Sequence, residues 1–291
     1  MTQIIRSLSD IAAQYDALFC DLWGCLHNGI TPFRAAVTAL QSFRAGGGRV
    51  ILVTNAPRPK SSVIKQLDGM GLPRDTWDDI ATSGDATQYA MLSGAVGTRI
   101  HHIGAPKDEV FFTDFEEDLA TLAASVTLTR VPLAEAEGIV CTGLADDLTE
   151  TPDDFRAQLL LGKTKGLKML CANPDLIVDM GHRRLYCAGA LAQAYEEMGA
   201  EALYFGKPHP PIYDLARRRL GMNDPRILCV GDGIGTDVQG GLAEGLDTLF
   251  VTGGIAAKEF GEDSSNPNKD LLEAWLTKQQ LSATFSIGHL S

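Results

Sequence analysis

Short apolar runs alternate with segments of helical periodicity along most of the chain. The expected strands in the first third are 17–23, 48–55 and 78–84, with helical segments at 32–47 and 60–71 between them. These strands are filled with Val, Ile and Leu and show no polar alternation, which is typical of a parallel sheet covered by helices on both faces. The pattern therefore predicts an α/β fold whose core is a Rossmann-like, doubly wound parallel sheet.

The last third of the chain repeats this alternation, with expected strands at 201–206, 225–233 and 246–254. The middle has its own strand-like runs and a helical segment, which indicates a second and smaller α/β domain. We therefore predict a discontinuous core domain made of 1–85 and 182–291, with an inserted α/β cap domain at 86–181.

The charge and hydropathy of the chain limit its partners. The 291 residues carry a net charge of −12, so no basic footprint is available for nucleic acid or an anionic membrane. Global charge does not exclude a phosphorylated substrate, because local dipoles and a metal ion can override it. No apolar run approaches the length of a membrane span, and the first residues lack the pattern of a secretory signal. We expect a cytoplasmic protein.

The six cysteines are scattered and contain no CxxC pair. Four of them sit within or at the ends of apolar runs, as expected for buried thiols. We predict reduced core thiols rather than metal ligands or disulfides. The set is Cys20, Cys25, Cys141, Cys171, Cys187 and Cys229.

Polar residues follow four of the expected strands at their carboxyl ends. In open parallel sheets, ligands bind outside this edge. Three carboxylates there would repel one another unless positive charge lay among them. Lys207 offers one charge, and a divalent cation with oxygen ligands would supply the rest. The residues are Asp21, Thr54, Asn55, Lys207, Asp232 and Asp237.

Four segments resemble the ordered motifs of the haloacid dehalogenase-like (HAD) hydrolase superfamily. The insertion between the second and third motifs, with its TSGDATQYA and CANPD segments, is similar to the class IIA capped phosphatases, the NagD-like or p-nitrophenylphosphatase-like group. The resemblance spans nearly the whole core. The four segments are FCDLWGCLHNG, ILVTNAP, GKPHPPIYDLA and GDGIGTDVQGGLAEGLDTLFVTGG.

The resemblance implies a phosphatase that acts on a small phosphorylated metabolite. Asp21 would be the nucleophile that forms an aspartyl-phosphate. Thr54 and the backbone N–H of Asn55 would hold phosphoryl oxygens, and Lys207 would neutralise the phosphoryl group. Asn173 corresponds to cap residues that face the substrate. A homodimer is expected on the same ground.

The resemblance also implies a Mg²⁺ centre. Its ligands would be the carboxylates of Asp21 and Asp232 and the backbone carbonyl of Trp23. Asp237 would bind the cation directly or through water. Because a backbone carbonyl does not depend on the side chain, the tryptophan leaves this ligand set intact.

Trp23 departs from the pattern of the phosphatases, which usually carry a second Asp two residues after the nucleophile. That Asp protonates the leaving oxygen and later activates water, whereas an indole N–H is a donor only. General acid–base help is worth about 10²–10⁴-fold in rate. We therefore expect a bias toward good leaving groups, such as aryl phosphates, acyl phosphates or anhydrides. His27, in the following turn, is a candidate replacement acid.

Two alternatives remain open at this point. A bulky aromatic at position 23 also resembles the dehalogenase branch, in which Asp attacks carbon without a metal, although GDGIGTD keeps both carboxylates of a metal loop. The other alternative is a catalytically impaired protein that binds phosphate and metal.

Adjacent His101 and His102 lie on an expected strand, so they should face opposite sides and not share a metal.

Overall fold

The computed structural model describes residues 2–180 and 183–291. The chain divides into two compact units. The first contains the chain through Thr54, Gln66–Ala81 and Tyr213–Ser291, and the second contains Asn55–Lys65 and Thr82–Ile212. The second unit is thus an insertion into the first, and the chain has the predicted α/β architecture of a Rossmann-like core with a cap.

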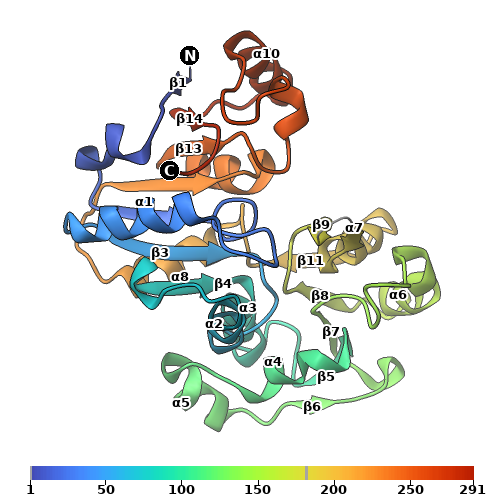
Figure 1. Cartoon of the computed structure of the whole chain (residues 1–291). Helices are drawn as coiled ribbons and strands as arrows, with labels where there is room; N and C mark the ends of the chain where they lie inside the picture. The colour runs from blue at the N-terminus through green and yellow to red at the C-terminus, as the bar shows by residue number, and fades with distance from the viewer. Residues whose placement is uncertain (1, 181–182) are drawn as a thin grey trace. The chain divides into compact units, whose positions relative to one another are not determined.

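A seven-stranded sheet forms the first unit within the described residues (Figure 1). In the order across the sheet that is given below, every pair of neighbouring strands between β1 and β3 is parallel. Strands β2 and β12 are buried at every position, as expected for strands covered on both faces. The order is β1 (Gln3–Ile4), β14 (Phe285–Ile287), β13 (Asp247–Val251), β12 (Ile227–Gly231), β2 (Ala17–Cys20), β3 (Arg49–Thr54) and β4 (Asp79–Thr82).

Helices α1 (Arg34–Ala45) and α10 (Lys269–Gln279) of the first unit each bury an apolar stripe. In α10, Leu272 and Leu276 pack with Phe250 of β13, and the Asn268 side chain caps the first turn. Among the described residues, no helix has the length and apolarity needed to cross a membrane. The helices are α1 (Arg34–Ala45), α9 (Gln239–Ala243) and α10 (Lys269–Gln279), with α2 (Lys60–Gly69) and α8 (Pro210–Leu220) continuing from one unit into the other.

The second unit is built on its own parallel sheet, five-stranded within the described residues. A two-stranded antiparallel sheet of β10 (Arg183–Tyr186) and β9 (Ile177–Met180) accompanies it. The five-stranded order is β11 (Glu201–Tyr204), β8 (Lys168–Cys171), β7 (Gly138–Cys141), β5 (Arg99–Ile103) and β6 (Thr129–Arg130).

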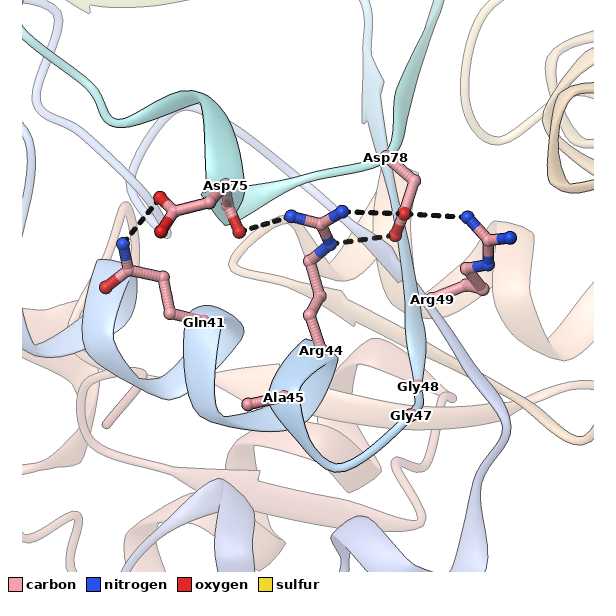
Figure 2. Close-up of a pocket in the computed structure, with 8 residues that line it drawn as sticks. All are labelled: Gln41, Arg44, Ala45, Gly47, Gly48, Arg49, Asp75 and Asp78. Atoms are coloured by element: carbon pink, nitrogen blue, oxygen red, sulfur yellow. Dashed lines mark hydrogen bonds and ion pairs between the residues drawn. The ribbon is translucent and has the colours of Figure 1, made fainter.

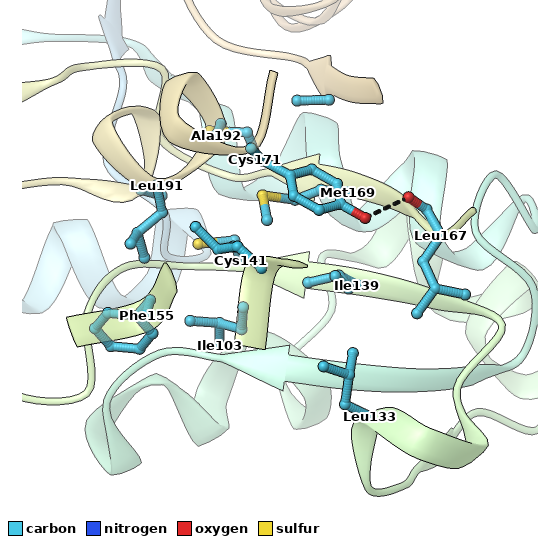
Figure 3. Close-up of a cluster of buried hydrophobic side chains, with 14 of the residues drawn as sticks. Ile103, Leu133, Ile139, Cys141, Phe155, Leu167, Met169, Cys171, Leu191 and Ala192 are labelled. Carbon is cyan, nitrogen blue, oxygen red and sulfur yellow. Dashed lines mark hydrogen bonds between the residues drawn. The ribbon is translucent and has the colours of Figure 1, made fainter. Parts of the chain in front are cut away.

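The core of the second unit joins this sheet to its helices (Figure 3). Tyr195 of α7 is fully buried among Ile139 and Met169, and its hydroxyl donates to the carbonyl of Leu167 at 2.6 Å. The bond satisfies a polar group that would otherwise be costly to bury. The helices are α3 (Ser83–Leu92), α4 (Val110–Thr113), α5 (Glu117–Ser125), α6 (Arg156–Thr164) and α7 (Ala188–Glu197).

The two units do not coincide with the expected ranges of 1–85 with 182–291 and of 86–181. Strand β11, expected in the core, pairs with β8 through Leu203 and Leu170, so the second unit continues to Ile212. A short apolar run predicts a strand, but its periodicity does not indicate which strand it pairs with, so it fits either sheet equally well.

Candidate active site

Asp21 lies at the carboxyl edge of the first sheet because β2 ends directly before it. Strands β2 and β12 pair in parallel with Cys20 opposite Val230, and the Asp21 N–H donates to the Val230 carbonyl at 2.8 Å. Asp232 follows the end of β12. The two carboxyl-bearing residues are each only 8% exposed. Register alone therefore delivers two buried carboxylates to one edge.

Thr54 ends β3, which pairs with β2 on the side opposite β12. It is buried, and the ladder pairs Leu52, two residues before Thr54, with Cys20, the residue that precedes Asp21. The sequence placed Thr54 and Asp21 at one edge, and the strand order of the structure does so as well.

A cluster of potential metal ligands forms around these strand ends. Asp21, Cys25 and Asp232 each offer one ligand atom, and these atoms lie within 4.8 Å of one another. Burial raises the pKa of the Cys25 thiol well above its usual value, and the negative charges of Asp232 and Asp21 add to this effect. The field at the cluster is therefore strongly negative.

Asp232 occupies space that two glycines leave open. A Cβ on Gly24 would lie 2.1 Å from Oδ2 of Asp232, and a Cβ on Gly254 would lie 2.0 Å from the same oxygen. The backbone N–H of Ile255 donates to this oxygen at 2.8 Å. Gly24 also has φ +81°, which other residues rarely adopt. The carboxylate is held in place, aimed into the cluster, as a cation site requires.

Asp237 has a different position. It lies in a π-helical turn over Ile234–Val238, and its Oδ2 accepts hydrogen bonds from the N–H of Gly233 at 3.1 Å and the hydroxyl of Thr236 at 3.2 Å. Asp237 is outside the three-residue cluster found in the described chain. Its carboxylate stabilises the loop that presents Asp232, and π-helical turns are frequent at functional sites.

The Trp23 indole packs into the turn that follows Asp21. Its ring lies edge-on to His27 at 5.4 Å, and a Cβ on Gly29 would lie 2.5 Å from the ring. His27 is 2% exposed, and its Nδ1 accepts the N–H of Gly29 at 3.0 Å. Burial lowers the pKa of His27 to about 4, so the imidazole is neutral at pH 7. A neutral ring with one nitrogen already bonded is a poor replacement for a carboxylic acid.

In the second unit, the side-chain amide of Asn55 holds the backbone of Lys207. Asn55 Oδ1 accepts the Lys207 N–H at 2.7 Å, and Asn55 Nδ2 donates to the Lys207 carbonyl at 3.0 Å. The same Nδ2 donates to Oδ1 of Asp175 at 2.8 Å, and the N–H of Asp175 donates to Oδ1 of Asn173 at 3.0 Å. Three of the predicted residues, Asn55, Asn173 and Lys207, are thus joined in one buried network.

The carboxyl edge of the second sheet also carries polar residues. His102 Nε2 lies 2.8 Å from the Thr142 hydroxyl, which donates to Oδ2 of Asp108 at 2.8 Å. On the other side of β5, His101 Nδ1 contacts the Val131 carbonyl at 3.1 Å. The two histidines therefore have separate partners, as expected for adjacent residues of a strand.

A hollow at the opposite edge of the first sheet is lined by charged residues but offers no comparable chemistry (Figure 2). Arg44 pairs with Asp78 at 2.8 Å and Arg49 pairs with the same carboxylate at 2.9 Å. Gln41 donates to Asp75. The arginines that line the hollow are paired with acidic residues of the same hollow, so we do not assign a ligand to it.

Three features of the site lay beyond the reach of the sequence. Cys25 was expected to be an ordinary core thiol, and only its spacing of four residues from Asp21 within a glycine-containing turn was a signal. The Asn55 side chain clamps Lys207 although the two are far apart in the chain. The Ile255 N–H reaches Asp232 from a loop that carries no motif of its own.

Comparison with known proteins gives a consistent result. Family models match residues 18–116 (haloacid dehalogenase-like hydrolase) and 204–274 (HAD-hydrolase-like). The chain is similar to the crystal structure of a hydrolase of the haloacid dehalogenase-like family from Brucella suis 1330. The two are 37% identical over 99% of this chain and 100% of that one, with a TM-score of 0.84.

Two further relatives carry names that describe an activity. The 5'-nucleotidase YutF of Bacillus subtilis is 25% identical over 267 residues, covering 90% of this chain and 98% of that protein. A glycerol phosphate phosphatase from Mycobacterium tuberculosis, crystallised in complex with magnesium, is 27% identical. The match covers 86% of this chain and 71% of that one, with a TM-score of 0.61.

Proposed function

Because this chain belongs to the haloacid dehalogenase-like hydrolases, in the class IIA group of capped phosphatases, we propose that it hydrolyses small phosphomonoesters through an aspartyl-phosphate on Asp21. The observation that carries the proposal is the buried convergence of Asp21 and Asp232 at the ends of adjacent parallel strands. The relatives named as a 5'-nucleotidase and a glycerol phosphate phosphatase support the substrate class.

The proposed cofactor is Mg²⁺, and the residues present fit it. Two buried carboxylates of like charge converge there, and a cation offsets their repulsion. Asp21, Asp232 and the Trp23 carbonyl would hold the ion, with Asp237 fixing the loop. When bound, Mg²⁺ would stabilise negative charge on the phosphoryl oxygens.

The remaining chemistry belongs to residues of the chain. The Asp21 carboxylate attacks phosphorus, the bond to the leaving oxygen breaks, and that oxygen keeps the electron pair. The Thr54 hydroxyl, the Asn55 N–H and the Lys207 ammonium orient and neutralise the phosphoryl oxygens in this proposal. Water then hydrolyses the aspartyl-phosphate and releases inorganic phosphate.

Trp23 restricts the substrates in this scheme. It has no proton for the leaving oxygen, and the buried, neutral His27 does not supply one at pH 7. Leaving groups that are stable as anions should therefore react fastest, namely aryl phosphates, acyl phosphates and anhydrides. Hydrolysis of the aspartyl-phosphate should be slow, because no base at position 23 activates water.

The proposal is tested by Mg²⁺-dependent hydrolysis of p-nitrophenyl phosphate. Asp21→Asn or EDTA should lower kcat/KM by at least about 10³-fold. Asp108→Asn is the matched control, since Asp108 is also a buried acid but lies in the second unit, in the short helix Pro106–Glu109, and it should keep the wild-type rate within a few-fold. Turnover that survives Asp21→Asn would overturn the proposal. A silent wild type activated by Trp23→Asp would instead support the phosphate-binding alternative.

A further inference from the structure

The ligand cluster at the first sheet contains sulfur as well as oxygen. Cys25 Sγ lies within 4.8 Å of a carboxylate oxygen from each of Asp21 and Asp232. Mg²⁺ prefers oxygen ligands and gains little from a thiol. Thiolate and carboxylate together are instead typical ligands of Zn²⁺ and related thiophilic divalent ions. The donor set is therefore broader than the proposed cofactor needs.

The Cys25 thiol is buried at this cluster without a hydrogen bond. It is 1% exposed, and in the described part of the chain no acceptor holds it. By contrast, the Cys20 thiol donates to the Asp21 carbonyl and the Cys171 thiol to the Asn173 carbonyl, both at 3.3 Å. The Cys25 thiol is thus available as a metal ligand beside two carboxylates.

The three ligands are held by short-range contacts. The turn that carries Cys25 is closed by the N–H of Gly24 donating to the His27 carbonyl at 2.9 Å and the N–H of Leu26 donating to the Leu22 carbonyl at 2.8 Å. Asp232 is fixed by the Ile255 N–H. Because these ligands are already held in place, binding of a cation to all three would cost little conformational entropy. Such preorganisation favours affinity.

We infer that Asp21, Cys25 and Asp232 form a binding site for a thiophilic divalent cation, Zn²⁺ or Cd²⁺, that competes with Mg²⁺. When the ion binds, the S–H bond of Cys25 breaks, a metal–sulfur bond forms, and the proton leaves to solvent with no change of oxidation state. Three protein ligands leave a fourth tetrahedral position open for water.

The inhibitory consequence rests on the proposed function. Zn²⁺ or Cd²⁺ bound to Asp21, Cys25 and Asp232 takes the place that Mg²⁺ needs in the proposed reaction. Zn²⁺ or Cd²⁺ should therefore lower turnover in the presence of Mg²⁺, and excess Mg²⁺ should displace them only poorly, because thiolate gives Mg²⁺ no comparable bond.

The test is a titration of metal-free protein with Cd²⁺, followed by the ultraviolet thiolate-to-cadmium charge-transfer band. Wild type should develop the band to one equivalent, and Cys229→Ser, a buried thiol in the same unit, should behave alike. Cys25→Ser should lose the band and weaken Cd²⁺ binding by at least about tenfold. Its Mg²⁺ affinity, measured by calorimetry, should stay within about twofold of wild type, because serine leaves the two carboxylates in place.

A band that persists in Cys25→Ser, or no band in wild type, would overturn the inference. If Cys25→Ser does not fold, the ¹¹³Cd resonance of wild type decides, since a sulfur-ligated ion resonates far downfield of an all-oxygen one. Mg²⁺-dependent turnover of wild type is measured separately. A band without turnover would reject the proposed function and keep the metal site, whereas turnover without a band would do the reverse.

Discussion

The carboxyl edges of the two sheets have the same architecture and different chemistry. Both are the ends of parallel strands, and both collect polar side chains. At the first edge, Asp21 and Asp232 meet as buried groups of the same charge. At the second edge, His102, Thr142 and Asp108 pass hydrogen bonds to one another. Polar residues at strand ends therefore do not define a site by themselves. At the first edge, the convergence of two buried carboxylates is what supports the proposed cation site.

Protonation equilibria deepen the contrast. Burial lowers the pKa of His102 to about 4 and raises the pKa of Asp108, so each is driven toward its neutral form. The second edge therefore reduces its own charge. At the first edge, in our proposal, a bound cation instead offsets the charge.

Removal of one polar group from each edge should have the largest effect. Asp232→Asn should abolish measurable Mg²⁺ binding and lower kcat/KM for p-nitrophenyl phosphate by at least about 10³-fold, because one of two carboxylate ligands is lost. Thr142→Val, the matched change at the second edge, should alter kcat/KM by no more than a few-fold. Equal losses in both variants would mean that the second edge also takes part in the chemistry.

The Asn55 clamp offers the next largest effect. Asn55→Ala removes both bonds to the Lys207 backbone and should lower kcat by about 10–100-fold through mispositioning of the ammonium group. Inorganic phosphate should also inhibit this variant less strongly. Asp175→Asn keeps an oxygen acceptor for Asn55 and should behave nearly as wild type. Wild-type kinetics in Asn55→Ala would remove Asn55 from the account.

Glycine substitutions sharpen the claim that Asp232 is held by the space around it. Gly24 and Gly47 both have positive φ, +81° and +96°, but only a Cβ on Gly24 meets the Asp232 carboxylate. Each alanine variant should cost about 1 kcal/mol of stability from backbone strain. Gly24→Ala alone should also weaken Mg²⁺ binding, by about tenfold, as measured by calorimetry. Equal Mg²⁺ affinities would show that the carboxylate adapts.

The smallest expected effect is on acid stability. The pKa of His102 is about 4 in the folded chain and about 6.5 when unfolded, so the unfolded state binds more protons between these values. Stability should therefore fall as the pH drops from about 6.5 toward 4 and be insensitive to this group above that range. His102→Gln should flatten the fall in urea midpoint between pH 7 and pH 5. An unchanged slope would contradict the assignment.

Most residues of the first edge could be predicted from the sequence, but few of the strand pairings and side-chain hydrogen bonds within the second unit could. The apolar runs that precede Asp21, Thr54 and Asp232 are long enough to predict parallel strands. Because the carboxyl ends of parallel strands lie at the same edge of a sheet, these residues could be placed together. Strand β11 and the Asn55–Lys207 clamp depend instead on pairings between distant segments, which periodicity does not encode. Cys25 is a buried free thiol, as predicted, but its closeness to Asp232 depends on another strand and was not predicted.

Covalent catalysis by Asp21 is tested by a rapid-mixing experiment with p-nitrophenyl phosphate and Mg²⁺. We expect a burst of p-nitrophenolate of about one equivalent per chain, followed by a slower steady rate. Asp21 should be phosphorylated readily, whereas no base at position 23 helps water to remove the phosphoryl group. Trp23→Asp should shrink the burst and raise the steady rate, by about 10²-fold or more. Asp21→Asn should show neither phase. Linear release from wild type, with turnover retained in Asp21→Asn, would contradict covalent catalysis by Asp21.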